Sequence, residues 1–242
     1  MSTNIYSINN LLEGSVIKRP SKICKTPYVA DILPVNSNTE VLGHSASLGC
    51  CGLVDKGASI LMAPITKSSK KQVCQYSIFL SVLREQKKEK IEEIIIGIHP
   101  KLAEELVEAA LKNNLLNKLQ YVKRYKRETP IYVEGQVDSR FDFTGIDFNG
   151  IPFIMEVKNV PLADYEDISA KDKKLLGINP YHDREFDSKV AYFPDGYRKK
   201  TSDPVSPRAL KHIRELTLIK KQSKTRCIMC YVIQRTDVNR FQ

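Results

Sequence analysis

Residues 137–158 decide the fold, and they read Val-Asp-Ser-Arg-Phe-Asp-Phe-Thr-Gly-Ile-Asp-Phe-Asn-Gly-Ile-Pro-Phe-Ile-Met-Glu-Val-Lys. Two apolar runs of the kind found in strands flank Asn149-Gly150, so this stretch predicts a β-hairpin. Asp142, Glu156 and Lys158 lie within these apolar runs. Acids and lysines are rarely buried unless they are paired or bound to a metal. The stretch therefore predicts a site as well as a hairpin.

The length of the turn determines which residues face one another across this hairpin. A two-residue loop places Asp142 opposite Val157, and Glu156 then points to the other side of the sheet. A three-residue loop that ends in a left-handed Gly150 shifts the register by one residue and places Asp142 opposite Glu156. Two carboxylates at one cross-strand pair repel each other unless a cation or a proton lies between them, and Lys158 shares the face of Glu156. For the three-residue loop we expect a divalent-metal site with a lysine beside it.

The chain has 242 residues and a net charge of +10 that is unevenly distributed. Residues 196–242 carry 12 lysines and arginines against three acids. Such concentrated positive charge favours a polyanionic partner, nucleic acid first, although a solvated surface has the same composition. No apolar run approaches the roughly 18–20 residues that span a bilayer, and residues 1–10 lack the features of a secretory signal. We expect a soluble intracellular protein of the cytoplasm or nucleus, without a membrane partner.

The cysteines do not form a recognisable metal-binding pattern. Cys227 and Cys230 have the spacing of zinc ligands, but they lie in a strand-like run, where residues three apart point to opposite faces. No second pair of Cys or His accompanies them. Buried free thiols in a reducing compartment are the better interpretation.

Residues 14–98 have the pattern of a small β-barrel or sandwich. Short apolar runs are separated by Pro, Asn, Ser and Gly, at 28–33, 40–44, 58–62 and 75–82. Residues 43–52 contain three glycines and His44. Such a loop can offer backbone amides to a phosphate, but a structural turn is the commoner reason for this composition. His44 and Gly49 are therefore candidates for a loop site.

The remaining chain alternates helices with strands. A strand at 92–99 precedes a helix that begins at Pro100 and ends near residue 113. Its acids, Glu104, Glu105 and Glu108, form either a solvated face or the source of one further metal ligand. This order, continued by the hairpin, predicts a short mixed sheet with helices on its faces.

A second helix begins at Ser206-Pro207 and continues to about Lys221, and its predicted apolar stripe consists of Leu210, Ile213, Leu216 or Thr217, and Ile219 or Lys220. Residues 227–233 form a continuous apolar run typical of a central strand. Residues 164–188 lack a regular pattern, so we interpret them as an insertion next to the site.

Basic residues gather in two further places. Residues 121–132 interleave lysines and arginines with tyrosines, a pattern that can hold phosphates and stack bases but also suits an ordinary edge strand. A second group lies in the first half of the second helix, near an N-terminus that favours anions. The candidate nucleic-acid contacts are Lys123, Arg124, Arg140, Arg198, Lys199, Arg208, Lys211, His212, Arg214 and Arg235.

The spacing of Asp142 from Glu156-Val157-Lys158 resembles the core of the PD-(D/E)xK nuclease superfamily. Five motifs in order resemble the sugar fermentation stimulation protein A family more specifically: Ser-Arg-Phe-Asp-Phe at 139–143, Glu-Val-Lys-Asn-Val at 156–160, Phe-Pro-Asp at 193–195, Lys-His-Ile-Arg-Glu-Leu at 211–216 and Val-Ile-Gln-Arg-Thr-Asp-Val at 232–238. The Pro-Asn-Thr-Gly loop of that family is replaced by Ala-Ser-Leu-Gly at 46–49.

This resemblance implies an α/β (α+β) protein with two domains. Residues 1–98 would form an OB-like β-barrel, and residues 99–242 a PD-(D/E)xK nuclease-like mixed sheet with flanking helices and an insertion at about 164–188. It also implies DNA binding, with Asp142 and Glu156 as metal-binding acids and Lys158 as the lysine of the core.

Three functions remain open at this point. The first is DNA binding on a nuclease-like scaffold. The second is a Mg²⁺- or Mn²⁺-dependent DNA nuclease, in which Asp142, Glu156 and the Val157 carbonyl hold the metal while Lys158 orients the nucleophile or neutralises charge. The third is a non-enzymatic interaction protein with a buried salt bridge, although two acids and one lysine leave a negative charge uncompensated. DNA or RNA, single or double strands, and a dimer or another oligomeric state are all compatible with the sequence.

Overall fold

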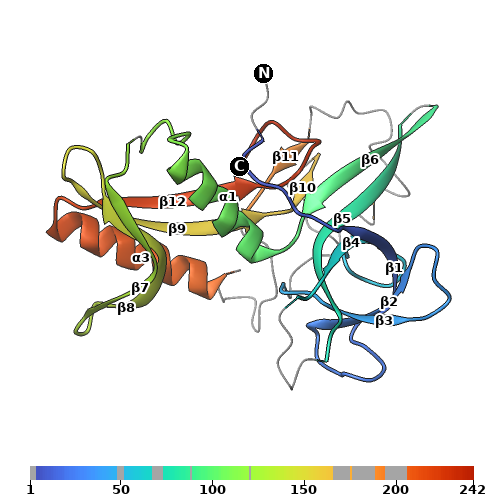
Figure 1. Cartoon of the computed structure of the whole chain (residues 1–242). Helices are drawn as coiled ribbons and strands as arrows, with labels where there is room; N and C mark the ends of the chain where they lie inside the picture. The colour runs from blue at the N-terminus through green and yellow to red at the C-terminus, as the bar shows by residue number, and fades with distance from the viewer. Residues whose placement is uncertain are drawn as a thin grey trace. The chain divides into compact units, whose positions relative to one another are not determined.

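The computed structural model describes residues 4–47, 52–66, 73–87, 89–119, 121–165, 175, 189–193 and 206–242. The chain is of the mixed α+β class, rich in sheets, and divides into two compact units (Figure 1). The barrel unit comprises Ile8–His99, Val160–Phe193 and Ile233–Gln242, and the sheet–helix unit comprises Met1–Ser7, Pro100–Asn159 and Pro194–Val232. The sequence analysis assigned 160–193 and 233–242 to the C-terminal domain, whereas the contacts of the described residues in these two ranges group them with the barrel unit.

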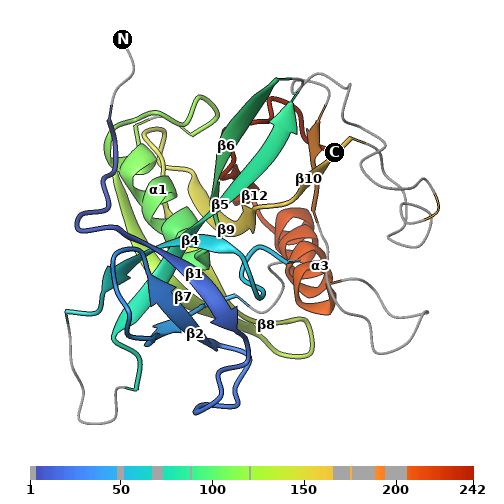
Figure 2. The same ribbon diagram turned by 90° about the vertical axis from the view of Figure 1, so that its right-hand side faces the viewer.

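The barrel unit is built on six strands: β1 (Leu12–Lys18), β2 (Val29–Pro34), β3 (Val41–His44), β4 (Ser59–Pro64), β5 (Tyr76–Lys87) and β6 (Lys90–Gly97). They lie in the order β3-β2-β1-β4-β5-β6, and a further pairing of β3 with β5 partly closes the ring. Apolar side chains such as Ile32, Ile60 and Ile78 fill its interior. The expected OB-like barrel is thus present, and the long β5–β6 hairpin extends from it (Figure 2).

Segments from later in the sequence complete the barrel unit. β10 (Ala163–Asp164) pairs with β11 (Val190–Ala191), and the backbone of Gln242 donates a hydrogen bond to the carbonyl of Ala191. The amide of Gly97, at the end of β6, donates to the carbonyl of Gln234 at 2.7 Å. The C-terminal segment therefore lies against β6. Of the expected insertion, residues 166–174 and 176–188 lie outside the described residues.

The sheet–helix unit has a four-stranded sheet in the order β12-β9-β8-β7, formed by β7 (Arg124–Val133), β8 (Val137–Ile146), β9 (Pro152–Val160) and β12 (Arg226–Ile233). Helix α1 (Pro100–Lys112) covers one face, where Val107 packs with Met155. Helix α3 (Pro207–Gln222) covers the other face, where Leu216 packs with Ile154. Because adjacent residues of a strand point to opposite faces, Ile154 packs in the core layer beneath α3 and Met155 in the core layer beneath α1.

Two details of this unit differ from the sequence analysis. The run at 227–233 forms β12, which lies at an edge of the sheet and not at its centre. Its residues are apolar because both faces are covered: Met229 packs in the α3 cluster, and Ile228 in the α1 cluster. Cys227 and Cys230 also lie in these two different clusters, as expected for strand residues three apart.

The buried face of α3 is displaced by about one residue from the predicted apolar stripe. Ile213 is exposed, whereas the buried residues are Ala209, His212, Glu215 and Leu216. The prediction counted only apolar residues, and two of the buried residues are polar. Ser206 precedes the helix as expected, but its side chain makes no capping hydrogen bond.

The β8–β9 hairpin has the register of the three-residue loop. Phe143 pairs with Met155, as this loop requires. Gly150 has φ of 80° and donates its amide to the carbonyl of Asp147, whose own amide donates to the carbonyl of Ile151 at 3.0 Å. The predicted bulge and its register are confirmed.

We predict that Gly150→Ala lowers the free energy of unfolding by about 1 kcal/mol, because a β-carbon disfavours a positive φ. Crowding is not the reason, since a β-carbon at this position meets no atom within 4 Å. Gly150→Asn is the matched control, and it should cost less because asparagine tolerates the left-handed region. Urea unfolding followed by circular dichroism measures both variants, and equal losses would contradict the explanation.

Candidate functional site

The regular alternation of side chains between the two faces of β8 is interrupted at Asp142. Phe141 packs in the α3 cluster and Phe143 in the α1 cluster, although residues two apart normally share a face. The same interruption occurs opposite, in β7, where Glu128 has φ of 46° and the pairing with Asp142 is skipped. Asp142 therefore lies where the regular ladder is broken, and its Oδ2 accepts a hydrogen bond from the amide of Val157 at 2.6 Å.

Glu156 lies on the α3 side of the sheet and is 2% exposed. Its Oε1 contacts both the Nζ of Lys158 and the Nδ1 of His212, the latter at 2.5 Å. Burial opposes ionisation, but the hydrogen bond with His212 and the charge of Lys158 outweigh it and hold the pKa of Glu156 below its usual value. An ionised carboxylate only accepts hydrogen bonds, so Nδ1 of His212 carries the proton in this contact.

His212 supports Glu156 from helix α3. Its ring is 3% exposed and packs against Phe141, with 5.7 Å between the ring centroids. Packing on one side and a hydrogen bond on the other fix the imidazole, and through it the carboxylate. The sequence analysis placed His212 among surface cations, whereas the structure places it in the interior. Its spacing from Ala209 and Leu216, three and four residues away, is the signal that would have assigned it to the buried face.

The charge on Asp142 is disfavoured by its surroundings. Burial, the charge of Glu156 and the charge of Glu104 together raise the pKa of Asp142 to about 6, against the opposing effects of the Val157 amide and Lys158. The two carboxylates of the predicted pair are thus close enough to repel each other. Glu104 adds a third acid, and it comes from helix α1.

The helix acids have different environments. Nη2 of Arg127 contacts Glu104 and its Nη1 contacts Glu108, each at 2.8 Å. Glu105 instead accepts a hydrogen bond from the hydroxyl of Tyr6. These acids are half-buried and partnered rather than a purely solvated face. Glu104 is the one whose charge reaches Asp142.

The acid pair meets some of the requirements of a cation site. Glu156 Oε2 is buried and has no hydrogen-bond partner among the described residues. Buried carboxylate oxygens normally have partners, so this atom is a free acceptor for a cation. Within the described part of the chain, however, no group of three or more His, Cys, Asp or Glu side chains is arranged to hold a metal. The donors present suit an oxygen-preferring ion such as Mg²⁺ or Ca²⁺ that keeps water or phosphate as its other ligands.

The expected nucleic-acid contacts fall into three groups. The exposed ones all belong to the sheet–helix unit: Lys123, Arg124, Arg140, Arg208, Lys211 and Arg214. His212 and Arg235 have buried side chains. Arg198 and Lys199 lie outside the described residues. Of the loop candidates, His44 stacks on Tyr28 with 6.4 Å between the rings, and Gly49 also lies outside the described residues.

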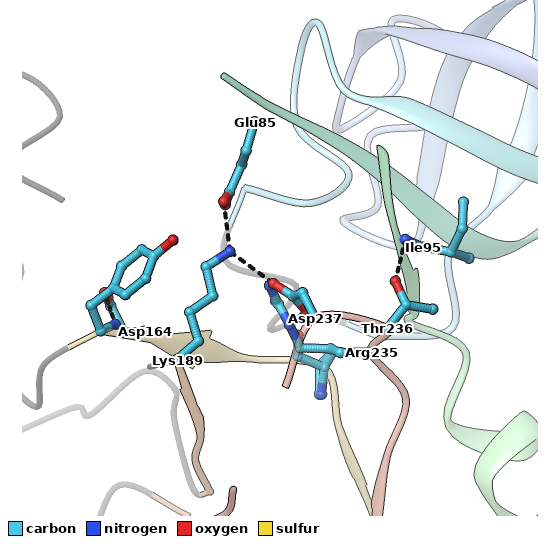
Figure 3. A network of polar contacts seen from close by, with 9 residues as sticks. Glu85, Ile95, Asp164, Lys189, Arg235, Thr236 and Asp237 are labelled. Carbon is cyan, nitrogen blue, oxygen red and sulfur yellow. Dashed lines mark hydrogen bonds and ion pairs between the residues drawn. The ribbon is translucent and has the colours of Figure 1, made fainter. Parts of the chain in front are cut away.

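Arg235 belongs to a buried ion network in the barrel unit (Figure 3). Its guanidinium contacts both carboxylate oxygens of Asp237, and it donates to the carbonyl of Pro161 at 2.9 Å. The ammonium of Lys189 lies between Asp237 at 2.8 Å and Glu85 at 2.6 Å. Two cations and two acids balance each other, so this network ties the C-terminal segment to β5 rather than presenting charge to a ligand.

We predict that Lys189→Met lowers the free energy of unfolding by about 3 kcal/mol, because it leaves buried Asp237 with one cation fewer. The matched control is Lys22→Met in the same unit, which removes the exposed ion pair with Glu40 and should cost less than about 1 kcal/mol. Both are measured by urea unfolding. Similar losses for the two variants would show that the network contributes no more than a surface ion pair.

The raised pKa of Asp142 predicts that Asp142→Asn stabilises the protein at alkaline pH in the presence of a chelator. A carboxyl whose pKa is 3.8 in the unfolded chain and about 6 in the folded protein contributes stability below pH 3.8 that is lost as the pH rises through 6. Asparagine keeps an acceptor for the Val157 amide but carries no charge. Relative to wild type, its advantage should grow by about 1 kcal/mol between pH 5 and pH 8. A stability difference that does not change with pH would contradict the repulsion.

Comparisons with known proteins agree with one another. The family profile described as "Sugar fermentation stimulation protein RE domain" matches residues 183–242. A sugar fermentation stimulation protein homolog of Jannaschia sp. (strain CCS1) is 30% identical over 209 residues, which cover 86% of this chain and 69% of that protein. A homolog from Prochlorococcus marinus (strain MIT 9301) is 26% identical over 245 residues, which cover 98% of this chain and 80% of that protein.

A solved structure has the same fold. Pyrococcus furiosus SfsA in complex with Ca²⁺ superposes with a TM-score of 0.67 and 17% sequence identity, covering all of this chain and 80% of that one. No helix in the described part of the chain is long and apolar enough to cross a membrane.

Proposed function

The chain belongs to the sugar fermentation stimulation protein family, and on that premise we propose that it binds DNA beside a divalent cation held by Asp142 and Glu156. The observation that carries this proposal is the proximity of a half-buried and a buried carboxylate on adjacent strands: Asp142 has a raised pKa, and one oxygen of Glu156 has no partner among the described residues. A divalent cation neutralises both charges at once. The Val157 carbonyl is the third ligand we assign, and the Ca²⁺ in the Pyrococcus furiosus structure supports the choice of a hard cation.

The charge distribution supports a polyanionic partner. Six of the expected nucleic-acid contacts in the sheet–helix unit are exposed basic residues, whereas the acids of the site are largely buried. Lys211, one of them, reaches the carbonyl of Asp138 at 2.5 Å and so holds its charge near β8. DNA phosphates that approach this unit meet these six exposed cations, whereas Glu156 lies in the interior.

Phosphodiester hydrolysis is the second candidate, and the position of Lys158 favours it. Lys158 is 15% exposed, contacts Glu156 and adds positive charge beside the acid pair. A bound divalent cation would activate water and neutralise charge on the phosphate. In this role Lys158 orients the nucleophile or offsets negative charge, while His212 keeps Glu156 in position.

The experiment combines Ca²⁺ titration with DNA binding. Glu156→Gln should weaken Ca²⁺ binding at least tenfold by calorimetry, because it removes one of the two charged ligands. Glu215→Gln is the matched control, a buried acid of α3 that accepts a hydrogen bond from the Asp138 amide, and it should retain Ca²⁺ affinity. Fluorescence anisotropy with labelled DNA should show affinity that falls about 100-fold between 50 and 200 mM salt if four phosphates are contacted.

The outcomes separate the candidate functions. Cleavage of the DNA with Mg²⁺ or Mn²⁺ that is lost in Lys158→Met, with binding retained, would establish the nuclease. Binding without cleavage leaves DNA binding alone. If neither Ca²⁺ nor DNA binds, the charged trio is a structural salt bridge and the proposal is wrong.

A further inference from the structure

Two exposed aromatic rings meet at the tip of the β8–β9 hairpin. Phe148 is 65% exposed and Tyr121 is 61% exposed, yet their ring centroids lie 6.3 Å apart at an interplanar angle of 63°. They come from different segments, the hairpin tip and the loop before β7. Neither ring is part of the apolar core, so core packing does not explain why they lie together.

Hydrogen bonds hold the backbone of the two segments that carry these rings. The amide of Tyr121 donates to the side-chain oxygen of Asn114 at 3.1 Å. At the tip, the amide of Ile151 donates to the Asp147 carboxylate at 2.9 Å, and the Gly150 turn fixes the same residues. Segments whose backbone is ordered before a ligand arrives lose less conformational entropy when it binds.

A positive charge lies beside the Phe148 ring. The Nζ of Lys123 lies 5.7 Å from the centroid of Phe148, and Arg124 is exposed next to it in the sequence. Asp147, the acid of the tip, is 2% exposed and paired with Arg226 at 3.0 Å. The surface therefore combines aromatic faces with cations, and its acid is buried and neutralised.

We propose that Tyr121, Lys123 and Phe148 form a platform that stacks the unpaired bases of single-stranded DNA. This inference rests on the proposed DNA binding and specifies that the DNA is single-stranded. Aromatic rings stack on bases of any sequence, and adjacent cations hold the phosphates of the same strand. A duplex offers its bases only at their edges, so the rings have no equivalent contact with it. A purely apolar protein partner would leave Lys123 and Arg124 without partners.

The test uses labelled single-stranded and duplex DNA with the full chain. The combined variant Tyr121→Ala with Phe148→Ala should lose at least tenfold in affinity for the single strand, since stacking is worth about 1–3 kcal/mol per base. Its affinity for the duplex should change less than twofold. Tyr121→Phe should retain single-strand affinity, because the ring is preserved. The matched control is Tyr132→Ala, which removes an aromatic ring that is 72% exposed at the far end of β7.

Different failures have different meanings. If wild type binds DNA but the combined variant and Tyr132→Ala lose affinity equally, or neither loses any, the platform is wrong and the proposed function stands. If wild type binds no DNA, both are wrong. If the combined variant keeps single-strand affinity but changes from dimer to monomer in sedimentation, the rings contact a second copy of the chain and the inference is overturned.

Discussion

The register of the β8–β9 hairpin is the constraint on which the sheet–helix unit depends. The hydrogen bonds of Asp147 at the tip, with Gly150 in the left-handed region, set this register. A slip of one residue would exchange the faces of Met155 and Glu156, placing the acid among the apolar residues of the α1 cluster and the methionine against His212. The core and the acid pair are therefore specified by the same turn.

At the interruption in β8, Asp142 lies within electrostatic reach of acids from two different layers. A regular β8 would keep Phe141 and Phe143 on one face, but each packs against a different helix. Between them, the carboxylate of Asp142 accepts a hydrogen bond from the Val157 amide, in place of a regular backbone contact of the ladder. From this position its carboxylate is affected by Glu156 and also by Glu104 of α1. A broken ladder costs backbone hydrogen bonding, and such costs concentrate at functional sites.

The sequence was sufficient where local chemistry decides the structure, and insufficient where tertiary pairing decides it. Asn149-Gly150 predicted a turn, and a left-handed Gly150 predicted the register of the three-residue loop. Glu128 has a positive φ without being glycine, so the interruption in β7 and β8 had no local signal. His212 and Arg235 looked like surface cations because each is basic, but burial beside Glu156 and Asp237 depends on segments far away in sequence. The apolar run of β12 indicates that both of its faces are covered. An edge strand and a central strand can both be covered on two faces, so the run did not determine the position of β12 in the sheet.

The pattern of contacts argues against a purely structural salt bridge at the acid pair. Lys158 and His212 both contact Oε1 of Glu156 and leave Oε2 without a partner among the described residues, whereas a structural bridge gains most when both oxygens are used. The surroundings of Asp142 raise its pKa to about 6, so the ionised carboxylate destabilises the fold at neutral pH. In the proposed arrangement a cation removes this cost. Phe148 lies six residues from Asp142 on the same hairpin, about 20 Å of strand, so the proposed platform and the proposed cation site are separated by the length of a few nucleotides.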